Sequence, residues 1–279
     1  MSTQNSAVDV GRIGVWRGGA IGSDLAAAIE GLGYSAIWVG SSPAGDLADI
    51  ERLLGATDTI RVATGIVNIW QADPAETAAS YHRVEAGFPG RFLLGIGAGH
   101  REATKEFAKP YTALAEYLDV LDANGVPLDR RVLAALGPKV LKLAGDRTAG
   151  AHPYLVTAEH TRQARAILGP DKLLAPEQKV VFAPDRERAR EIGDETLGFY
   201  LKLQNYTGNL RRLGYTDEDL AGRGSDRLFD DLILYGDPAK IAAGVLAHLD
   251  AGADHVAVQV VGDEDPVPAL RALAPELGL

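Results

Sequence analysis

The sequence predicts a (β/α)8 (TIM) barrel, because short apolar runs alternate with segments of helical length about eight times along its 279 residues. We interpret the apolar runs as the strands Arg12–Trp16, Ala36–Val39, Arg61–Ile69, Phe92–Gly95, Val132–Ala135, Ala151–Val156, Lys179–Phe182 and Val256–Val260. The segments between them have helical spacing of apolar residues, as in Asp24–Leu32, Pro74–Ala86, Lys109–Ala123 and Pro238–Ala251. Strands joined by helices pair in parallel, and eight such units fit a closed barrel. Barrels of this kind carry their chemistry on the loops after the strands, so the search for a site narrows to those loops.

The helices begin and end at residues suited to those positions. Asp24, Asp73 and Asp237 stand at expected helix starts, and a proline follows the last two. Gly33 and Gly87 follow helical segments, where glycine readily closes the last turn.

The alternation is interrupted between Phe182 and Val256, where the chain is longer than one helix requires. We therefore predict an insertion between strands seven and eight. Its stretch Leu197–Leu213 mixes aromatic and polar residues, and Glu218–Asp226 is polar and reads as a mobile loop. The insertion is either a surface excursion beside the barrel or a lid over its mouth. We favour the lid, because long loops in compact domains are often functional.

Composition predicts one globular domain over residues 1–279, since 46% of the residues are hydrophobic. No apolar run approaches the roughly 18 residues of a membrane span, and Met1–Val10 lacks the order of a signal peptide. The net charge of -10 argues against a nucleic-acid partner. Without cysteine, a disulfide, a thiolate metal site and a cysteine nucleophile are excluded. We expect a cytoplasmic protein.

Large aromatic and glycine residues stand at the expected strand ends. Trp16, Trp38 and Trp70 lie at or near the ends of the first three strands and suit a planar ligand, although Trp38 alternates with its neighbour and can face either layer. After the fourth strand comes a glycine-rich run, Gly95–Gly99, that allows close approach of a ligand. We reject a dinucleotide motif, which belongs after the first strand of a Rossmann unit. His100 follows this run at a position where barrel enzymes keep catalytic groups.

A candidate anion site follows the fifth strand. Gly137, Pro138 and Lys139 lead into a helix whose first backbone amides can bind an anion, although a plain helix start explains the same residues equally well. The polar tail of the sixth strand, ending at Thr157, can contact a substrate, while we take His152 as structural.

The residues that several kinds of catalysis require are missing from this sequence or stand at unsuitable positions. There is no HExxH motif, no HxH pair and no acidic residue at the end of the first five strands, so we predict no metal site. A Schiff-base lysine needs an inner strand position, whereas Lys139 begins a helix and we place Lys179 at the wrong end of its strand. Apolar walls, an anion site and few acid–base groups favour a site in which a bound cofactor does the chemistry.

The same stretches resemble the bacterial luciferase-like superfamily, and within it the branch that uses the deazaflavin coenzyme F420. The resemblance covers nearly the whole chain and rests on Leu25–Val39, Val62–Asn68, Pro89–Gly97 and Leu136–Lys139, of which the part Gly90–Gly97 is the most specific.

The resemblance implies a luciferase-like barrel that binds F420, or alternatively FMN, at its mouth, and a homodimer. It implies a non-prolyl cis peptide at Gly65–Ile66 against the cofactor ring, and a cofactor phosphate on the amides of Gly137, Lys139 and Val140. It places His100 beside the cofactor ring as the catalytic residue. The implied cofactor-binding residues are Gly65, Ile66, Val67, Asn68, Gly97, Gly99, Gly137, Pro138, Lys139 and Val140. The residues expected to bind substrate are Trp16, Trp70 and Thr157.

The chain departs from the family after the second strand, where Gly40–Pro43 replaces the acidic residue and histidine of known deazaflavin dehydrogenases. Either His100 takes their role, or the enzyme reduces a substrate and needs little proton help. We therefore predict an F420-dependent oxidoreductase that transfers a hydride between the deazaflavin and a small organic substrate. The alternatives are a reduced-FMN monooxygenase, a non-catalytic flavin-binding member and, ranked last, a phosphate-binding barrel isomerase or synthase.

Overall fold

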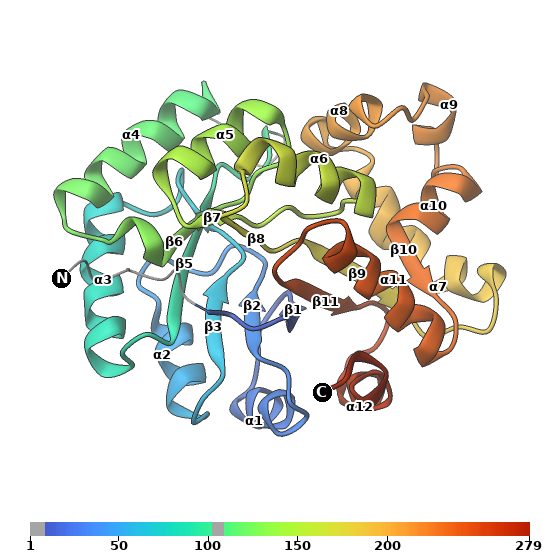
Figure 1. The fold of residues 1–279 in the computed structure, drawn as a ribbon, viewed down its shortest axis with the longest axis horizontal. Helices are drawn as coiled ribbons and strands as arrows, with labels where there is room; N and C mark the ends of the chain where they lie inside the picture. Colours follow the sequence, from blue (N-terminus) through green and yellow to red (C-terminus); the bar gives the residue numbers. More distant parts are fainter. Residues whose placement is uncertain (1–8, 102–108) are drawn as a thin grey trace.

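The computed structural model describes residues 9–101 and 109–279 (Figure 1). Its strands are β1 (Ile13–Arg17), β2 (Ala36–Val39), β3 (Arg61–Thr64), β4 (Val67–Asn68), β5 (Phe92–Gly97), β6 (Arg131–Leu133), β7 (Gly150–Ala151), β8 (Leu173–Leu174), β9 (Glu177–Val181), β10 (Ile233–Tyr235) and β11 (Val256–Val260). Its helices are α1 (Ser23–Gly31), α2 (Ala48–Gly55), α3 (Pro74–Gly87), α4 (Pro110–Ala123), α5 (Pro138–Arg147), α6 (Ala158–Leu168), α7 (Arg186–Tyr200), α8 (Gln204–Arg212), α9 (Asp217–Leu220), α10 (Asp226–Leu232), α11 (Pro238–Asp250) and α12 (Val267–Leu273).

The strands form one curled parallel sheet in the order β10-β9-β11-β1-β2-β3-β5-β6-β7-β8, with β4 paired to β5 (Figure 1). The stretch from β8 to β9 is bonded on both sides. On one side the Ala175 amide donates to the Ala151 carbonyl at 2.9 Å, and on the other the Ala257 amide donates to the Pro176 carbonyl at 2.9 Å. The two sides of the curled sheet therefore meet at this stretch, and the barrel-like arrangement expected from the alternation of strands and helices is present.

Six of the eight expected strands have other bounds in the structure, and the sixth, seventh and third of them bear on the site. The sixth, expected over Ala151–Val156, is reduced to β7, because Pro153 has no amide hydrogen to donate and Leu155 adopts a φ of 55°. The seventh, expected over Lys179–Phe182, begins two residues earlier, at Glu177. The third, expected over Arg61–Ile69, is interrupted after Thr64 and resumes as β4.

A cis peptide expected at Gly65–Ile66 is absent, since every peptide bond of the described residues is trans. The pairing of β3 is interrupted here although the peptide bonds are trans. The Gly65 amide still donates to the Val39 carbonyl at 2.7 Å, and pairing resumes between Val67 and Ile96. Between the positions bridged to β5 the chain has three residues, Thr64–Ile66, against two on β5, so it bulges here.

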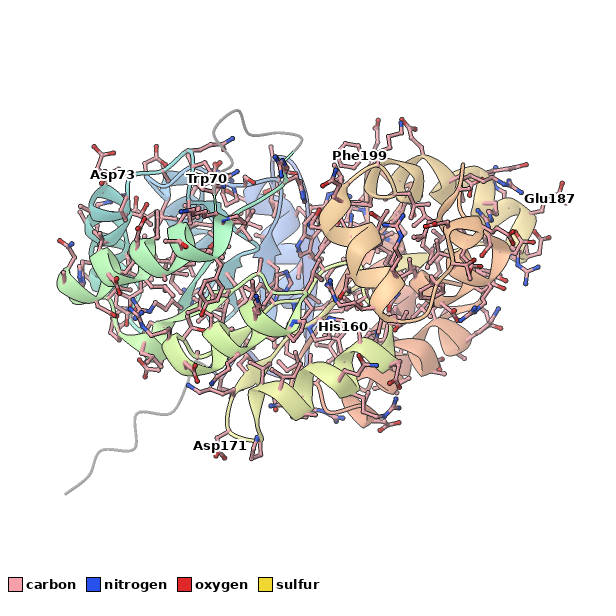
Figure 2. All side chains as sticks on the ribbon, turned by 90° about the horizontal axis from the view of Figure 1, so that it is seen from above. Trp70, Asp73, His160, Asp171, Glu187 and Phe199 are labelled. Carbon is pink, nitrogen blue, oxygen red and sulfur yellow. The ribbon has the colours of Figure 1, made fainter. Side chains whose placement is uncertain are left out.

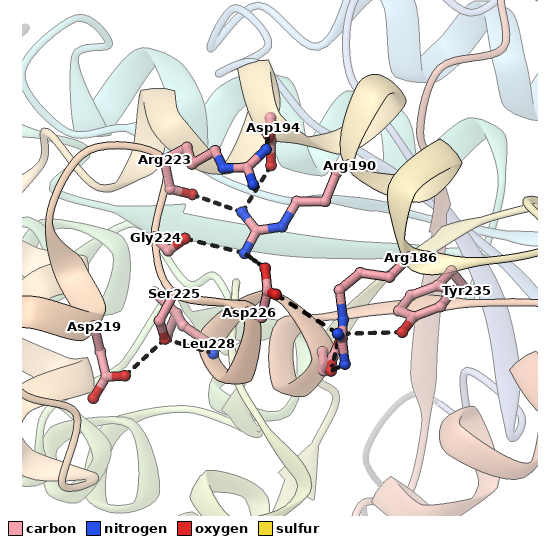
Figure 3. Close-up of polar contacts among 11 residues, drawn as sticks. Arg186, Arg190, Asp194, Asp219, Arg223, Gly224, Ser225, Asp226, Leu228 and Tyr235 are labelled. Carbon is pink, nitrogen blue, oxygen red and sulfur yellow. Dashed lines mark hydrogen bonds and ion pairs between the residues drawn. The ribbon is translucent and has the colours of Figure 1, made fainter.

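The segment between β9 and β11 contains α7 to α11 and β10, and β10 pairs with the outer side of β9 (Figure 1). The mobile loop expected over Glu218–Asp226 is instead anchored. The buried guanidinium of Arg190 donates to the Gly224 carbonyl at 3.0 Å and pairs with Asp226 at 3.0 Å and Asp194 at 2.8 Å (Figure 3). A capping box joins Thr216 to Asp219 at the start of α9.

The helices begin where the sequence predicts. Asp73 accepts hydrogen bonds from the amides of Ala75 and Glu76, and Asp237 accepts one from the amide of Lys240. At α1 the side chain of Asp24 lies in the first turn without a cap bond. No helix within residues 9–101 and 109–279 is long and apolar enough to cross a membrane.

Candidate active site

A cavity of about 660 Å³ opens where the strands end. The segments after β1, β2, β3, β5, β6 and β7 form one part of its wall, and α4, α5, α7 and α8 form the rest. The walls are mainly apolar or aromatic, as expected for a pocket that binds an organic ligand. Phe199 lies at its edge with 54% of its surface exposed, on the α7 side of the molecule (Figure 2).

The cavity brings together eight of the fourteen residues that the sequence singled out. These are Trp16, Gly65, Ile66, Gly99, His100, Gly137, Lys139 and Val140. Six others lie outside its lining: Val67, Asn68, Trp70, Gly97, Pro138 and Thr157.

The residues outside the lining support those inside it. A Cβ on Gly97 would lie 2.7 Å from Ile66 Cγ2, so this glycine lets the bulge approach β5. The Trp70 indole donates to the Ala98 carbonyl at 2.8 Å, on the side of the molecule away from Phe199 (Figure 2). Thr157 caps α6 by accepting from the His160 amide at 3.2 Å.

One end of the cavity is suited to an anion. The N-cap of α5 is Gly137, and no side chain caps this helix. A Cβ on Gly137 would lie 3.3 Å from the guanidinium of Arg212, and Lys139 also lines this end. The positive end of the helix dipole and two cations therefore converge. The Val140 amide donates to the Gly137 carbonyl at 3.1 Å, so it is already engaged within the first turn.

The cavity also has an aromatic wall that the sequence analysis did not predict. Ring centroids follow one another from Trp16 to Tyr154 at 4.9 Å, from Tyr154 to Tyr200 at 5.2 Å, and from Tyr200 to Tyr206 at 5.0 Å. His100 continues the wall, with its ring 5.5 Å from that of Tyr206. The residues come from β1, the loop after β7, α7, α8 and the loop after β5, which only the fold brings together.

The tyrosine hydroxyls form a short chain of hydrogen bonds. Tyr154 donates to Gln259 Oε1 at 2.9 Å, and the hydroxyls of Tyr154 and Tyr200 are 2.7 Å apart. A phenol has one proton to donate, so Tyr200 donates to Tyr154. Burial raises the pKa of Tyr200 to about 12 and the pKa of Tyr154 still further, which keeps both phenols protonated at neutral pH.

A fully buried ion pair lies against this wall. Lys179 Nζ is 3.0 Å and 3.1 Å from the two carboxylate oxygens of Glu177, and neither side chain is exposed. The ammonium also lies 3.7 Å from the ring centroid of Tyr154. Our placement of Lys179 at the wrong end of its strand was wrong, because β9 begins at Glu177 and puts Lys179 at its centre. Burial lowers the pKa of Lys179 and raises that of Glu177, and the partner opposes each shift.

His152, which the sequence analysis takes as structural, is held as a structural group would be and also lines the cavity. Nδ1 lies 2.6 Å from the Ala175 carbonyl, which can only accept, so Nδ1 carries the proton. The ring stacks on Trp38 at 4.1 Å, and burial lowers its pKa to about 4. His152 is therefore a neutral acceptor through Nε2.

The fold and the cavity together define an α/β barrel-like protein with a cavity at the strand ends, lined by the cationic start of α5 with Arg212 and by an aromatic wall. Residues 21–124 match the family model of luciferase-like monooxygenases. Solved structures of low sequence identity share the fold over nearly the whole chain.

One is an F420-dependent secondary alcohol dehydrogenase in complex with an F420-acetone adduct, with a TM-score of 0.75, 16% identity and coverage of 96% of this chain and 99% of that one. Another is the coenzyme F420-dependent tetrahydromethanopterin reductase from Methanopyrus kandleri, with a TM-score of 0.71, 15% identity and coverage of 96% and 98%. A third is the oxygenating constituent of 3,6-diketocamphane monooxygenase from Pseudomonas putida in complex with FMN, with a TM-score of 0.66, 15% identity and coverage of 95% and 96%.

Proposed function

We propose that this protein is an F420-dependent oxidoreductase that transfers a hydride between the deazaflavin and a small organic substrate in the cytoplasm. The observation that carries the proposal is the cavity itself, whose lining combines an anion site and an aromatic wall. The similarity to two F420-dependent enzymes supports it.

The residues present fit such a cofactor. Arg212, Lys139 and the backbone amides of Gly137 and Lys139 would hold its phosphate, and the glycines at Gly65 and Gly99 let the ring lie close to the backbone. A side chain at Gly99 would meet Asn68 Nδ2 at 2.9 Å. When bound, the cofactor supplies or accepts the hydride. His100 lies where it can hydrogen-bond the ring or the substrate.

A reduced-FMN monooxygenase is the alternative, and two observations favour it. The matching family model is that of luciferase-like monooxygenases, and one similar structure contains FMN. Both cofactors carry a phosphate, so the anion site alone does not distinguish them.

An anaerobic fluorescence titration with F420, and separately with FMN, tests the proposal. We expect micromolar binding of F420 and much weaker binding of FMN. Tight binding of FMN alone would establish the alternative, and binding of neither would refute both.

Two variants locate the phosphate. Arg212→Gln should weaken cofactor binding about tenfold, equivalent to about 1.4 kcal/mol. Lys142→Gln is the matched control, because Lys142 lies on α5, the helix whose start lines the anion site, but is 72% exposed and paired with Asp146. Equal losses in the two variants would show that only net charge matters and that Arg212 does not contact the phosphate.

A further inference from the structure

We propose that Tyr200 is the proton donor of the reaction, that Tyr154 positions it, and that the enzyme therefore works in the reductive direction on a substrate with a carbonyl oxygen. This inference rests on the proposed function, and it goes beyond that function in naming the acid, the direction and the substrate class. It is carried by the hydrogen-bonded chain of Tyr200, Tyr154 and Gln259 in the cavity wall.

The geometry makes Tyr200 the outer member of that chain. Both phenols line the cavity, but Tyr154 is held from behind by Gln259 at 2.9 Å, whereas Tyr200 has its hydroxyl bond to Tyr154 alone among the described residues. A carbonyl oxygen that reaches Tyr200 can accept its proton when the phenol turns. Tyr154 can then turn its own O–H to the Tyr200 oxygen, so the chain reverses without leaving a phenol unbonded.

The charged groups around the chain fit an acid rather than a base. Lys179 Nζ lies 3.7 Å from the Tyr154 ring centroid and 5.0 Å from that of Tyr200, while Glu177 balances its charge from the same strand. Burial and the negative charge of Glu177 raise the pKa of Tyr200 to about 12. A phenol of that pKa is fully protonated at neutral pH, yet it is a stronger acid than the product alcohol, so it can protonate the alkoxide that forms on carbonyl reduction.

In the proposed step the carbonyl carbon gains a hydride from a reduced flavin or deazaflavin, which is oxidised by two electrons. The π pair of the C=O bond moves onto oxygen, which takes the phenolic proton of Tyr200. The phenolate regains a proton from water when the product leaves. Alcohol oxidation would need Tyr200 as a phenolate at the start, and its surroundings disfavour that state.

Three variants test this inference with reduced F420 and a panel of acetone, cyclohexanone and 2-cyclohexen-1-one. Tyr200→Phe should lower kcat at least about 100-fold on any panel member that wild type reduces, with the Kd of F420 unchanged. Tyr154→Phe should lower kcat roughly tenfold. Tyr34→Phe is the control, because it removes a buried hydroxyl, bonded to the Leu270 carbonyl at 2.9 Å, from a tyrosine that does not line the cavity.

The pH profile separates a tyrosine acid from a histidine acid. With Tyr200 as donor, single-turnover reduction should stay flat from about pH 6 to pH 9, since the phenol keeps its proton over that range. With His100 as donor, the rate would fall as pH rises past the ordinary histidine pKa near 6.5. Rescue gives a second readout, because small phenols should restore part of the rate in Tyr200→Ala but none in Tyr34→Ala.

Each result supports or overturns the inference. A full rate in Tyr200→Phe, or a profile that falls near pH 6.5 and is abolished in His100→Gln, would transfer the role to His100. Bound F420 with no reduction of any carbonyl in the panel would overturn the carbonyl assignment while the proposed cofactor stands. Absence of F420 binding to wild type is the separate result that ends the proposed function itself.

Discussion

Removing one member of the Glu177–Lys179 pair should destabilise the protein far more than removing both. The two N–O distances are 3.0 Å and 3.1 Å, and both side chains have no solvent exposure. Lys179→Met would leave a carboxylate buried with one remaining donor, the Leu155 amide at 3.1 Å. Breaking such a pair costs about 3–5 kcal/mol, whereas replacing both charges by residues of similar shape is close to neutral.

The destabilisation of Lys179→Met should grow as pH rises. In Lys179→Met the pKa of Glu177 rises further, because burial still raises it and the ammonium no longer opposes the shift. A group with a raised folded pKa contributes stability below its unfolded value, near 4.5, and loses it as pH rises toward the folded value. The variant should therefore lie closest to wild type near pH 5 and fall behind by up to about 1.4 kcal/mol per pH unit above it.

Urea unfolding at pH 5 and pH 8 measures both effects, with Glu177→Gln, Lys179→Met and the double variant forming a cycle. Lys142→Met is the control, since the exposed pair Lys142–Asp146 should contribute less than about 0.5 kcal/mol. If the two single losses add in the double variant, and the loss in Lys179→Met does not grow with pH, the reasoning about a buried coupled pair is refuted.

Three further predictions concern residues outside the cavity. Glu30→Gln should lower the free energy of unfolding by roughly 1–2 kcal/mol at pH 7 and by little near pH 2. Burial opposes the shift, but the amides of Asp58, Thr59 and Ile60 lower the pKa of Glu30 to about 2, so this stability is present above pH 4.5 and is lost as pH falls. Acid unfolding curves test this prediction. Arg190→Met should cost about 3–5 kcal/mol and speed limited proteolysis around Gly224, whereas the exposed Arg188→Met should change neither. Gly95→Ala should lower the thermal midpoint strongly, because its Cβ would lie 1.9 Å from the Thr64 carbonyl oxygen, whereas Gly87→Ala, with open space around it, should not.

Local patterns were enough to predict most of the fold. The ranges of β2 and β11 are those expected from apolar runs, and Asp73 and Asp237 begin helices as helix-capping chemistry requires. Errors occurred where a proline or tertiary pairing decides the outcome. Pro153 shortens β7, and the start of β9 depends on partners far away in the sequence.

The residues of the candidate site likewise include some that local sequence predicts and some that only tertiary packing brings to the cavity. Residues on one side of the cavity, such as Gly99, His100 and Gly137, follow strands directly and could be found from their position after a strand. Tyr200 could not be found in this way, because it ends a helix in the interrupted region and reaches the cavity only through tertiary packing. The aromatic and polar stretch over Leu197–Leu213 was the one available signal, and it pointed to the right segment without naming its chemistry.

The site looked poor in acid–base groups when read from the sequence because its strongest candidates are neutral ones. A search for catalytic carboxylates and histidines at strand ends overlooks phenols, because a phenol changes its charge only far above neutral pH. Here Tyr154, Tyr200 and Lys179 come from three separate elements, so their contacts of 2.7 Å and 3.7 Å exist only in the folded chain. If Tyr200 is the proton donor, as proposed, the enzyme does not need the acidic residue and histidine that are missing after β2. Tyr200 ends α7 and lines the same cavity as the residues after β2, and in a reductive reaction it never has to act as a base at neutral pH.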